Sequence, residues 1–313
     1  MHPSQPARRL LVSGSSGLIG TRVTSTYRAE GWTVTRLIRG TQPAPDAILW
    51  NPGTGSLQPA AVSGFDAVIH LAGEPLAGRW TAEKKRRIVA SRLQGTAELA
   101  TSLAAAEHPP KVFLCASGIN FYGNRGDTIL DEPAPHGSGF LAEVSETWER
   151  ASDPLTALSR VVSLRIGVVL APEGGMLPML LPLYRMGLGG TIGNGRGYVS
   201  WVTLDDLVRV TQHLIEHSDL RGPVNVVSPE PVTGRELTKA LSAATGKPAF
   251  IPVPAWATPR DGRNGRRNRP WQRPRSAETA PRRRLPIQRP HPLRSHGRLR
   301  HLPTLKTLCT ATR

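Results

Sequence analysis

The sequence predicts an α/β fold, built as a Rossmann-type doubly wound parallel sheet with a smaller C-terminal lobe. Two observations lead to this prediction. Short apolar runs alternate with helical stretches from Arg8 to about Leu170, and this alternation is typical of a parallel sheet with helices on both faces. The first apolar run is followed by a turn rich in glycine and then by a helix, which is the opening unit of such a sheet.

The opening unit consists of a strand over 9–13, the turn over 14–20, a helix as far as Ala29 and a second strand over 33–38. Glycine suits the turn because it allows a tight bend, lets backbone N–H groups approach a pyrophosphate and lets the helix pack against the strand. A helix N-terminus also attracts negative charge. The turn residues are therefore candidate ligands of a dinucleotide: Gly14, Ser15, Ser16, Gly17, Leu18, Ile19 and Gly20.

Composition excludes several classes of protein. With 39% apolar and 20% charged residues, the chain is neither wholly disordered nor a coiled coil. Cys115 and Cys309 form no C-x-x-C or His-Cys grouping, which argues against a disulfide framework or a structural zinc site and favours a reducing compartment. No apolar run reaches about 18 residues, and the N-terminus lacks the apolar core of a secretion signal. We therefore expect a cytoplasmic protein without a membrane partner.

The spacing G-x-x-G-x-x-G within 12–20 resembles the extended short-chain dehydrogenase/reductase superfamily. Residues 66–73 are similar to that superfamily's third coenzyme-contacting strand, which ends in L-A-G. Further segments resemble one atypical, largely uncharacterised branch, the "epimerase family" proteins, described as NAD-dependent epimerase/dehydratase-like. These segments lie at 70–75, 78–81, 91–96, 165–170, 186–190, 200–207 and 222–225, and the resemblance extends from residue 8 to about 257.

The resemblance implies a nicotinamide cofactor, and charge favours one of the two. A site selective for NAD places Asp or Glu near the end of the second strand to bind the ribose 2′-OH, whereas a 2′-phosphate requires Arg. Here no acid follows the strand before Asp46, so we expect NADP rather than NAD. The resemblance places an arginine at the end of this strand, which implies Arg39 as the phosphate ligand. The resemblance implies further cofactor contacts from Ile38, Leu71, Ala72, Gly73, Arg92 and Val169.

Short-chain dehydrogenases use Ser, Tyr and Lys, with Tyr and Lys four residues apart on one helix face. None of the four tyrosines is followed by lysine at that distance, and Phe140 and Val144 stand in the place of the pair on a helix over 139–149. Ser117 matches the superfamily's serine, and Tyr122 matches the tyrosine that shapes its pocket rim. We expect these two side chains to contact cofactor or substrate without proton transfer; acid/base work and a purely structural role are the alternatives.

Three other signals are assigned to structure. His213 and His217 belong to a formal H-x-x-E-H string, but it lies on a helix of the dinucleotide-binding architecture, so we predict no metal site. Asp205 and Asp206 are expected to be the N-cap and a first-turn acid of that helix. Six glycines within 187–197 predict a flexible loop over the substrate cleft.

The placement of these segments predicts the domain organisation. Thr233 and Glu236 are expected to form a capping box at the start of a lobe helix that ends near Gly246. The nucleotide-binding domain is expected to take residues 1–170 and 201–228, and a truncated substrate lobe residues 171–200 and 229–257.

Residues 258–313 differ from the rest of the chain. They contain 15 Arg, one Lys, two acids and eight Pro, which accounts for most of the net charge of +17 and predicts disorder. We hypothesise a frameshift or sequencing error, because the resemblance stops where Arg, Pro and Gly take over; a nucleic-acid-binding arm and a plain linker are the alternatives. A frameshift predicts that the lobe lacks its final helices and exposes an apolar face. Nucleic acid is an expected partner only if the tail is genuine.

Together these features predict an NADP-binding epimerase-like or oxidoreductase-like protein that acts on a hydroxyl-bearing small molecule, such as a nucleotide sugar. Because the Tyr-Lys pair is missing, the alternative is a non-catalytic NADP-binding sensor or regulator. The sequence names neither the substrate nor the oligomeric state.

Overall fold

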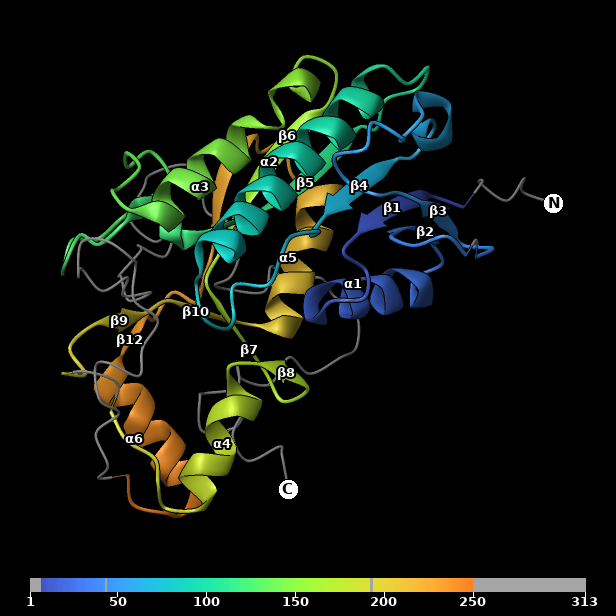
Figure 1. Cartoon of the computed structure of the whole chain (residues 1–313). Helices are drawn as coiled ribbons and strands as arrows, with labels where there is room; N and C mark the ends of the chain where they lie inside the picture. The colour runs from blue at the N-terminus through green and yellow to red at the C-terminus, as the bar shows by residue number, and fades with distance from the viewer. Residues whose placement is uncertain (1–6, 43, 192–193, 250–313) are drawn as a thin grey trace.

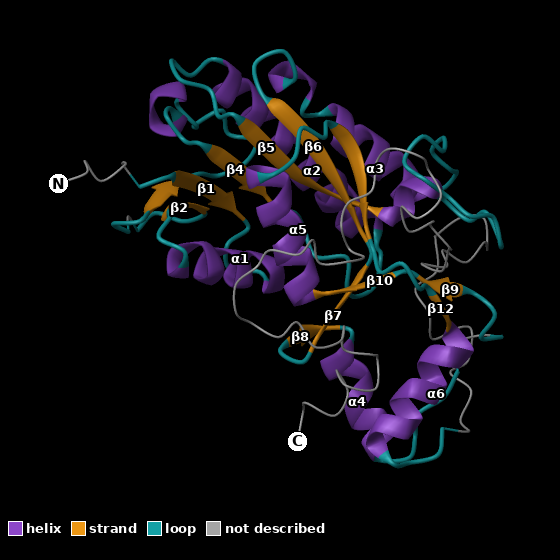
Figure 2. Cartoon of the chain, turned by 180° about the vertical axis from the view of Figure 1, so that it is seen from behind, coloured by secondary structure: helices purple, strands orange, loops and turns teal. Residues whose placement is uncertain are grey.

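The computed structural model describes residues 7–42, 44–191 and 194–249, and it confirms the α/β prediction (Figures 1 and 2). In Figure 1 a larger part built on a parallel sheet lies above a smaller lobe. The predictions made for the tail at 258–313 fall outside the described residues.

The larger part is built on seven strands: β1 (Arg9–Ser13), β2 (Thr33–Ile38), β3 (Ala47–Leu49), β4 (Ala67–His70), β5 (Val112–Gly118), β6 (Arg160–Ile166) and β11 (Gly222–Val226). They form one sheet in the order β11-β6-β5-β4-β1-β2-β3, and every neighbouring pair is parallel. The chain builds β2 and β3 on one side of β1 and then returns to add β4 on the other. This reversal is the switch point at which such sheets bind ligands, beyond the carboxyl ends of the strands.

Four helices cover the two faces of the sheet: α1 (Leu18–Ala29), α2 (Ala82–Ala104), α3 (Phe140–Arg150) and α5 (Leu204–Glu216). Helices α1 and α5 pack on one face, and α2 and α3 on the other (Figure 2). Leu10 and Val12 are buried with α1 and α5, whereas Leu11 is buried with α2 and α3. Because both faces are covered, the central strands β1, β4 and β5 are mostly apolar and buried. Short 3-10 segments occur at Pro59–Val62, Ile119–Tyr122 and Asp153–Leu155.

The smaller lobe contains helices α4 (Leu177–Arg185) and α6 (Gly234–Thr245) and the antiparallel strands β9 (Tyr198–Val199) and β12 (Val232–Thr233). A small sheet of β7 (Val168–Ala171), β8 (Gly174–Gly175) and β10 (Trp201–Thr203) lies between the two parts (Figure 1). The lobe has a core of its own, in which Leu177, Leu181 and Tyr184 of α4 pack with Leu237 and Leu241 of α6.

The capping box predicted at the start of α6 is confirmed. The Thr233 hydroxyl accepts a hydrogen bond from the Glu236 backbone N–H, and the Glu236 carboxylate accepts one from the Thr233 N–H. Gly246 closes the helix in the left-handed region, with φ of 64°.

The prediction of the α5 N-cap was wrong. The N-cap is Thr203, whose hydroxyl accepts a hydrogen bond from the Asp206 N–H at 3.0 Å. Both acids therefore lie inside the first turn, where the helix dipole stabilises negative charge. Asp205 forms an ion pair with Arg22 on the neighbouring helix α1. The strand β10 runs directly into the helix, so its last residue becomes the cap.

The H-x-x-E-H string lies on α5 and just beyond it. Arg8 forms an ion pair with Glu216 at 2.9 Å, and the rings of His213 and His217 are 6.1 Å apart. Across the ranges that the structure describes, no group of three or more His, Cys, Asp or Glu side chains is placed to hold a metal ion. The same ranges include no helix with the length and hydropathy to cross a membrane.

Candidate functional site

The turn between β1 and α1 and the first turn of α1 contain three glycines whose surroundings differ. Gly14 has φ of +68°, and a Cβ there would lie 2.7 Å from the carbonyl carbon of Leu71. A Cβ at Gly20 would lie 2.2 Å from the Gly14 carbonyl oxygen. Packing within the protein therefore requires these two glycines. A Cβ at Gly17 would meet only that same oxygen, at the ordinary contact distance of 3.4 Å. The space beside the Gly17 Cα is therefore not filled by other atoms of the described residues.

The N-terminus of α1 is open to an anion. Its N-cap, Gly17, has no side-chain acceptor, and the first turn contains no acidic residue. By contrast, α2, α5 and α6 each begin with a threonine whose hydroxyl accepts a backbone N–H, and each has an acid in its first turn. The backbone N–H groups and the positive dipole end of α1 are therefore available to a phosphate.

The other residues around this N-terminus differ in burial and in what they pack against. Ser15 is buried and Ser16 is exposed. The side chain of Leu18 lies against Gly174 of β8, where a Cβ would be 2.9 Å from it. Ile19 packs on the core shared by α1 and α5, as does Val169 of β7, so the structure brings the predicted contact at Val169 to the same region as the turn.

The end of β2 presents one available cation. Arg39 follows Ile38 directly, is exposed, and makes no ion pair or hydrogen bond to any residue in the part of the chain that the structure describes. Asp46, the first acid after β2, accepts hydrogen bonds from Arg36 and forms an ion pair with Arg28. The hydrogen bond from Arg36 holds the pKa of Asp46 below its ordinary value. This strand end therefore offers a guanidinium rather than a carboxylate to the ribose 2′ position.

The segment Leu71-Ala72-Gly73 follows β4 and forms the wall opposite Gly14. The hydroxyl of Ser13 accepts hydrogen bonds from the backbone N–H groups of Leu71 at 3.1 Å and Ala72 at 3.3 Å. The position of this wall is thus set by a buried serine at the end of β1. Sequence reasoning did not single out Ser13, although it directly precedes Gly14.

Arg92 supports the same segment from behind. Its guanidinium packs against Gly73, where a Cβ would lie 3.3 Å from Cζ, and stands over the Trp148 ring at 4.7 Å. Its Nη1 donates to the carbonyl oxygens of Glu74 and Ile88. Burial lowers the pKa of Arg92 to about 10, so the side chain stays charged at neutral pH. The structure thus places Arg92 as a support of the segment at 71–73, which is predicted to contact the coenzyme.

His70, the last residue of β4, is fully buried between two hydroxyl groups. Its Nδ1 lies 2.6 Å from Ser13 Oγ and its Nε2 2.8 Å from Thr96 Oγ1. Burial lowers the pKa of His70 to about 3, so the imidazole is neutral throughout the physiological range.

We predict that His70 makes the protein less stable in weak acid. Because an unfolded histidine titrates near about 6.5, the unfolded chain binds more protons than the folded chain below that pH. Stability should therefore fall as the pH drops from about 6.5 toward 3, by up to about 1.4 kcal/mol per pH unit. Urea unfolding from about pH 7 to about pH 5 measures this dependence. His70→Asn should show a shallower dependence, and identical slopes would contradict the assignment.

The two predicted catalytic candidates belong to one buried hydrogen-bond network. The Ser117 hydroxyl donates to Glu149 Oε1 at 2.7 Å. Arg165 donates to both oxygens of that carboxylate, from Nε and Nη2, each at 2.8 Å. Its Nη1 donates to the Tyr122 hydroxyl at 3.0 Å, and this hydroxyl donates in turn to Asn225 Oδ1 at 2.6 Å. The network ties β5, β6 and β11 to α3 at the carboxyl ends of the strands.

Within this network neither hydroxyl is set up as a base. Tyr122 is fully buried, and burial raises its pKa to about 12, so it is a protonated phenol at neutral pH. Ser117 is 5% exposed and directs its proton to Glu149, whose charge Arg165 neutralises. The geometry therefore favours contact and support over proton transfer for both residues. Glu149 was missed from the sequence, whereas Arg165 and Asn225 lay in segments already quoted for the resemblance.

The helix expected to carry the Tyr-Lys pair is α3, and it carries Phe140 and Val144 instead. Val144 is buried. The Phe140 ring meets Trp80 edge-on, with centroids 5.7 Å apart, and Lys85 Nζ lies 4.9 Å from the same ring. At the two positions where the resemblance places the Tyr-Lys pair, the structure therefore has an aromatic ring and a buried valine side chain.

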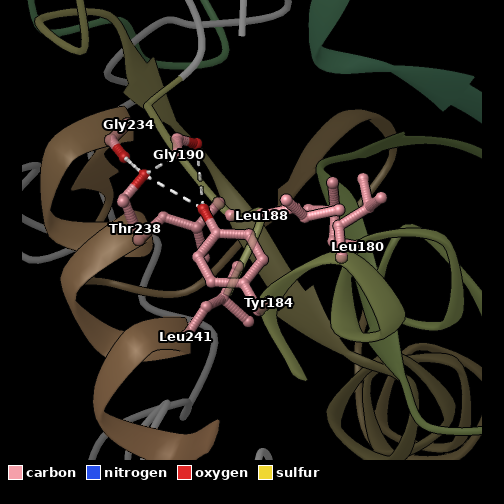
Figure 3. A pocket seen from close by; sticks show the side chains of 10 residues that line it. Leu180, Tyr184, Leu188, Gly190, Gly234, Thr238 and Leu241 are labelled. Atoms are coloured by element: carbon pink, nitrogen blue, oxygen red, sulfur yellow. Dashed lines mark hydrogen bonds between the residues drawn. The ribbon is translucent and has the colours of Figure 1, made fainter. Parts of the chain in front are cut away.

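A second candidate site is a groove in the lobe between α4 and α6 (Figure 3). Its volume is about 390 Å³, including open solvent. The Tyr184 hydroxyl donates to the Gly190 carbonyl at 3.0 Å, which holds the glycine-rich loop beside α6. The lining is almost entirely apolar, and the apolar surface continues along α4 and just beyond it, where Met179 is 68%, Leu183 41%, Met186 62% and Leu188 49% exposed. The groove lacks the polar groups that orient a small polar substrate.

Comparison with known proteins identifies the family. The sequence profile of the NAD dependent epimerase/dehydratase family matches residues 10–227. The Epimerase family protein Mb2239 of Mycobacterium bovis is 40% identical over 248 residues, covering 79% of this chain and 82% of that protein. The Epimerase family protein SDR39U1 of Bos taurus is 36% identical over 252 residues, covering 79% and 84%.

Solved structures agree with the sequence comparison. The human epimerase family protein SDR39U1 (isoform 2), crystallised with NADPH, is 33% identical, with a TM-score of 0.71 over 79% of this chain and 83% of that one. A nucleoside-diphosphate sugar epimerase from Corynebacterium glutamicum is 33% identical with a TM-score of 0.66, covering 80% of this chain and 54% of the other. The chain belongs to the NAD dependent epimerase/dehydratase family.

Proposed function

We propose that this protein binds NADP(H) and acts as an oxidoreductase or epimerase on a hydroxyl-bearing small molecule in the cytoplasm. The observation that carries the proposal is the pairing of an uncapped α1 N-terminus with Arg39, exposed at the end of β2. One binds the pyrophosphate and the other the 2′-phosphate. The human SDR39U1 structure with NADPH supports the choice of cofactor, and the buried free thiol of Cys115 fits a reducing compartment.

Each part of the site has a distinct role in this proposal. Gly17 leaves room for the pyrophosphate, and the N–H groups of Leu18 and Ile19 at the start of α1 face it. Arg39 pairs with the 2′-phosphate, and the segment at 71–73 lies along the adenosine. When bound, NADP supplies or accepts a hydride at its nicotinamide ring.

Proton transfer is the step for which this chain is least equipped. Phe140 and Val144 have no titratable group, and Tyr122 is held as a neutral phenol. We expect the substrate proton to pass through water, because the Ser117 hydroxyl directs its own proton to Glu149. Loss of a positioned acid/base group lowers a rate by about 10²- to 10⁴-fold. We therefore expect turnover on the order of 10⁻³ to 10⁻¹ s⁻¹ where an ordinary enzyme reaches about 10 s⁻¹.

A non-catalytic NADP(H) sensor is the second candidate function. The observation that favours it is the presence of Phe140 and Val144, which have no titratable group, at the expected positions of the acid/base pair. Such a protein keeps the cofactor contacts and needs no proton-transfer group.

One experiment separates the two candidates. NADPH and NADH are first titrated against the full chain by nicotinamide fluorescence. Hydride exchange is then followed with a panel of alcohols, carbonyls and nucleotide sugars, over hours because turnover is expected to be slow. Slow turnover with any member supports the enzyme, and tight binding with no exchange above the cofactor blank supports the sensor. Absence of binding to either nucleotide contradicts both.

A further inference from the structure

A chain of buried hydrogen bonds runs from the segment at 71–73, which lies beside the glycine turn, to helix α2 on one face of the sheet. It begins at the N–H groups of Leu71 and Ala72, passes through Ser13 to His70, and reaches Thr96 on α2. Trp148 on α3 donates to the same Thr96 hydroxyl from its indole nitrogen at 2.9 Å. His70 and Thr96 have no exposed surface, and Ser13 has none either.

Counting donors fixes the direction of each bond in this chain. Ser13 Oγ already accepts two backbone N–H groups, so its own proton is directed to His70 Nδ1. Nδ1 is then the acceptor, and the imidazole carries its proton on Nε2, which donates to Thr96. His70 therefore accepts a hydrogen bond at Nδ1 from Ser13 and donates one from Nε2 to Thr96 on α2.

The wall held by Ser13 touches the turn closely. The backbone of Leu71 lies so near Gly14 that a Cβ on Gly14 would come within 2.7 Å of its carbonyl carbon. A rotation of the Ser13 hydroxyl would remove the acceptor of the Ala72 N–H and leave the Leu71 N–H with the Ser13 backbone carbonyl oxygen, at 3.2 Å, as its remaining acceptor. The acceptor at His70 Nδ1 is what keeps that hydroxyl from rotating.

We propose that His70 is a positioning residue for the dinucleotide, acting through Ser13 to hold the segment at 71–73 against the glycine turn. The inference rests on the proposed binding of NADP(H). Only the hydrogen bond at Nδ1, which His70 accepts from Ser13, positions the segment at 71–73. The bond from Nε2 to Thr96 ties β4 to α2 and serves stability.

Two amide substitutions distinguish the role of the Nδ1 hydrogen bond from that of the Nε2 hydrogen bond. In His70→Asn the amide oxygen can occupy the place of Nδ1 and accept from Ser13, but it does not reach Thr96. In His70→Gln the longer side chain can place its NH₂ at Nε2 and donate to Thr96, leaving Ser13 without its acceptor. We expect His70→Gln to bind NADPH about 5- to 10-fold more weakly than wild type, and His70→Asn to stay within about 2-fold.

The measurement is the NADPH dissociation constant of the full-length variants, with urea unfolding run in parallel. Ser159→Ala is the matched control, because it removes a buried hydrogen bond to the Pro110 carbonyl at the opposite end of the strands. It should lower stability and leave the dissociation constant unchanged. Equal affinity of His70→Gln and wild type, or equal losses in the Asn and Gln variants, would overturn the inference. No NADPH binding by wild type would overturn the proposed function and this inference with it.

Discussion

Gly17→Ala is expected to abolish most NADPH binding while leaving the fold intact. The backbone at Gly17 is extended, with φ of −78°, and an added Cβ would meet only the Gly14 oxygen at 3.4 Å. The methyl group would instead enter the space where we place the pyrophosphate. Overpacking of this kind costs about 1–3 kcal/mol, which corresponds to a loss of affinity of about 5- to 150-fold. Fluorescence titration measures the affinity, and circular dichroism with thermal unfolding measures the fold.

Gly20→Ala is the matched comparison three residues away. Its Cβ would lie 2.2 Å from the Gly14 carbonyl oxygen, so the backbone of the turn must move. This variant should lose stability and binding together. If Gly17→Ala behaves in the same way, or retains full affinity, then the space beside Gly17 is not the pyrophosphate site.

Arg165→Met is expected to cause the largest loss of stability of any single change in the network. The side chain is 3% exposed and neutralises Glu149, which is 14% exposed. Removing one partner of a buried ion pair costs about 3–5 kcal/mol, because the other charge stays buried and uncompensated. Tyr122 also loses the donor to its hydroxyl. Urea unfolding of wild type and variant measures the difference.

The double variant Arg165→Met/Glu149→Leu provides the control. With both charges gone, an apolar pair fills the site, and most of the lost stability should return. Ser117 then loses its acceptor, so recovery should be incomplete. A double variant less stable than Arg165→Met alone would show that the ion pair is not the source of the effect.

The sequence was sufficient for those parts of the fold that depend on local pattern. The strand, glycine turn and helix from Arg9 to Ala29 are signalled by residue types at fixed spacing, and the capping box at Thr233 by two residues three apart. Asp205 was misplaced as an N-cap because Thr203 also ends a strand, and the boundary between strand and helix has no strong sequence signal.

The candidate site was predictable only in part. Arg39 could be proposed from the sequence because an acid is missing nearby and the resemblance places an arginine there, and its role stays a prediction. The network around Tyr122 could not, since Glu149 and Arg165 come from separate elements that meet only after the sheet has formed. Burial reverses the chemistry expected of an isolated tyrosine, and burial is a property of the assembled fold.

The most direct test of the account compares NADPH and NADH binding in wild type, Arg39→Ala and Arg36→Ala. Arg36 is the control, because its guanidinium is already occupied by Asp46. Wild type should prefer NADPH, and Arg39→Ala should lose about 10- to 100-fold in NADPH affinity, the worth of a charge-assisted hydrogen bond to phosphate, with little change for NADH. Arg36→Ala should retain the preference. Equal binding of the two nucleotides by wild type, or an unchanged preference in Arg39→Ala, would contradict the assignment of this site to NADP(H).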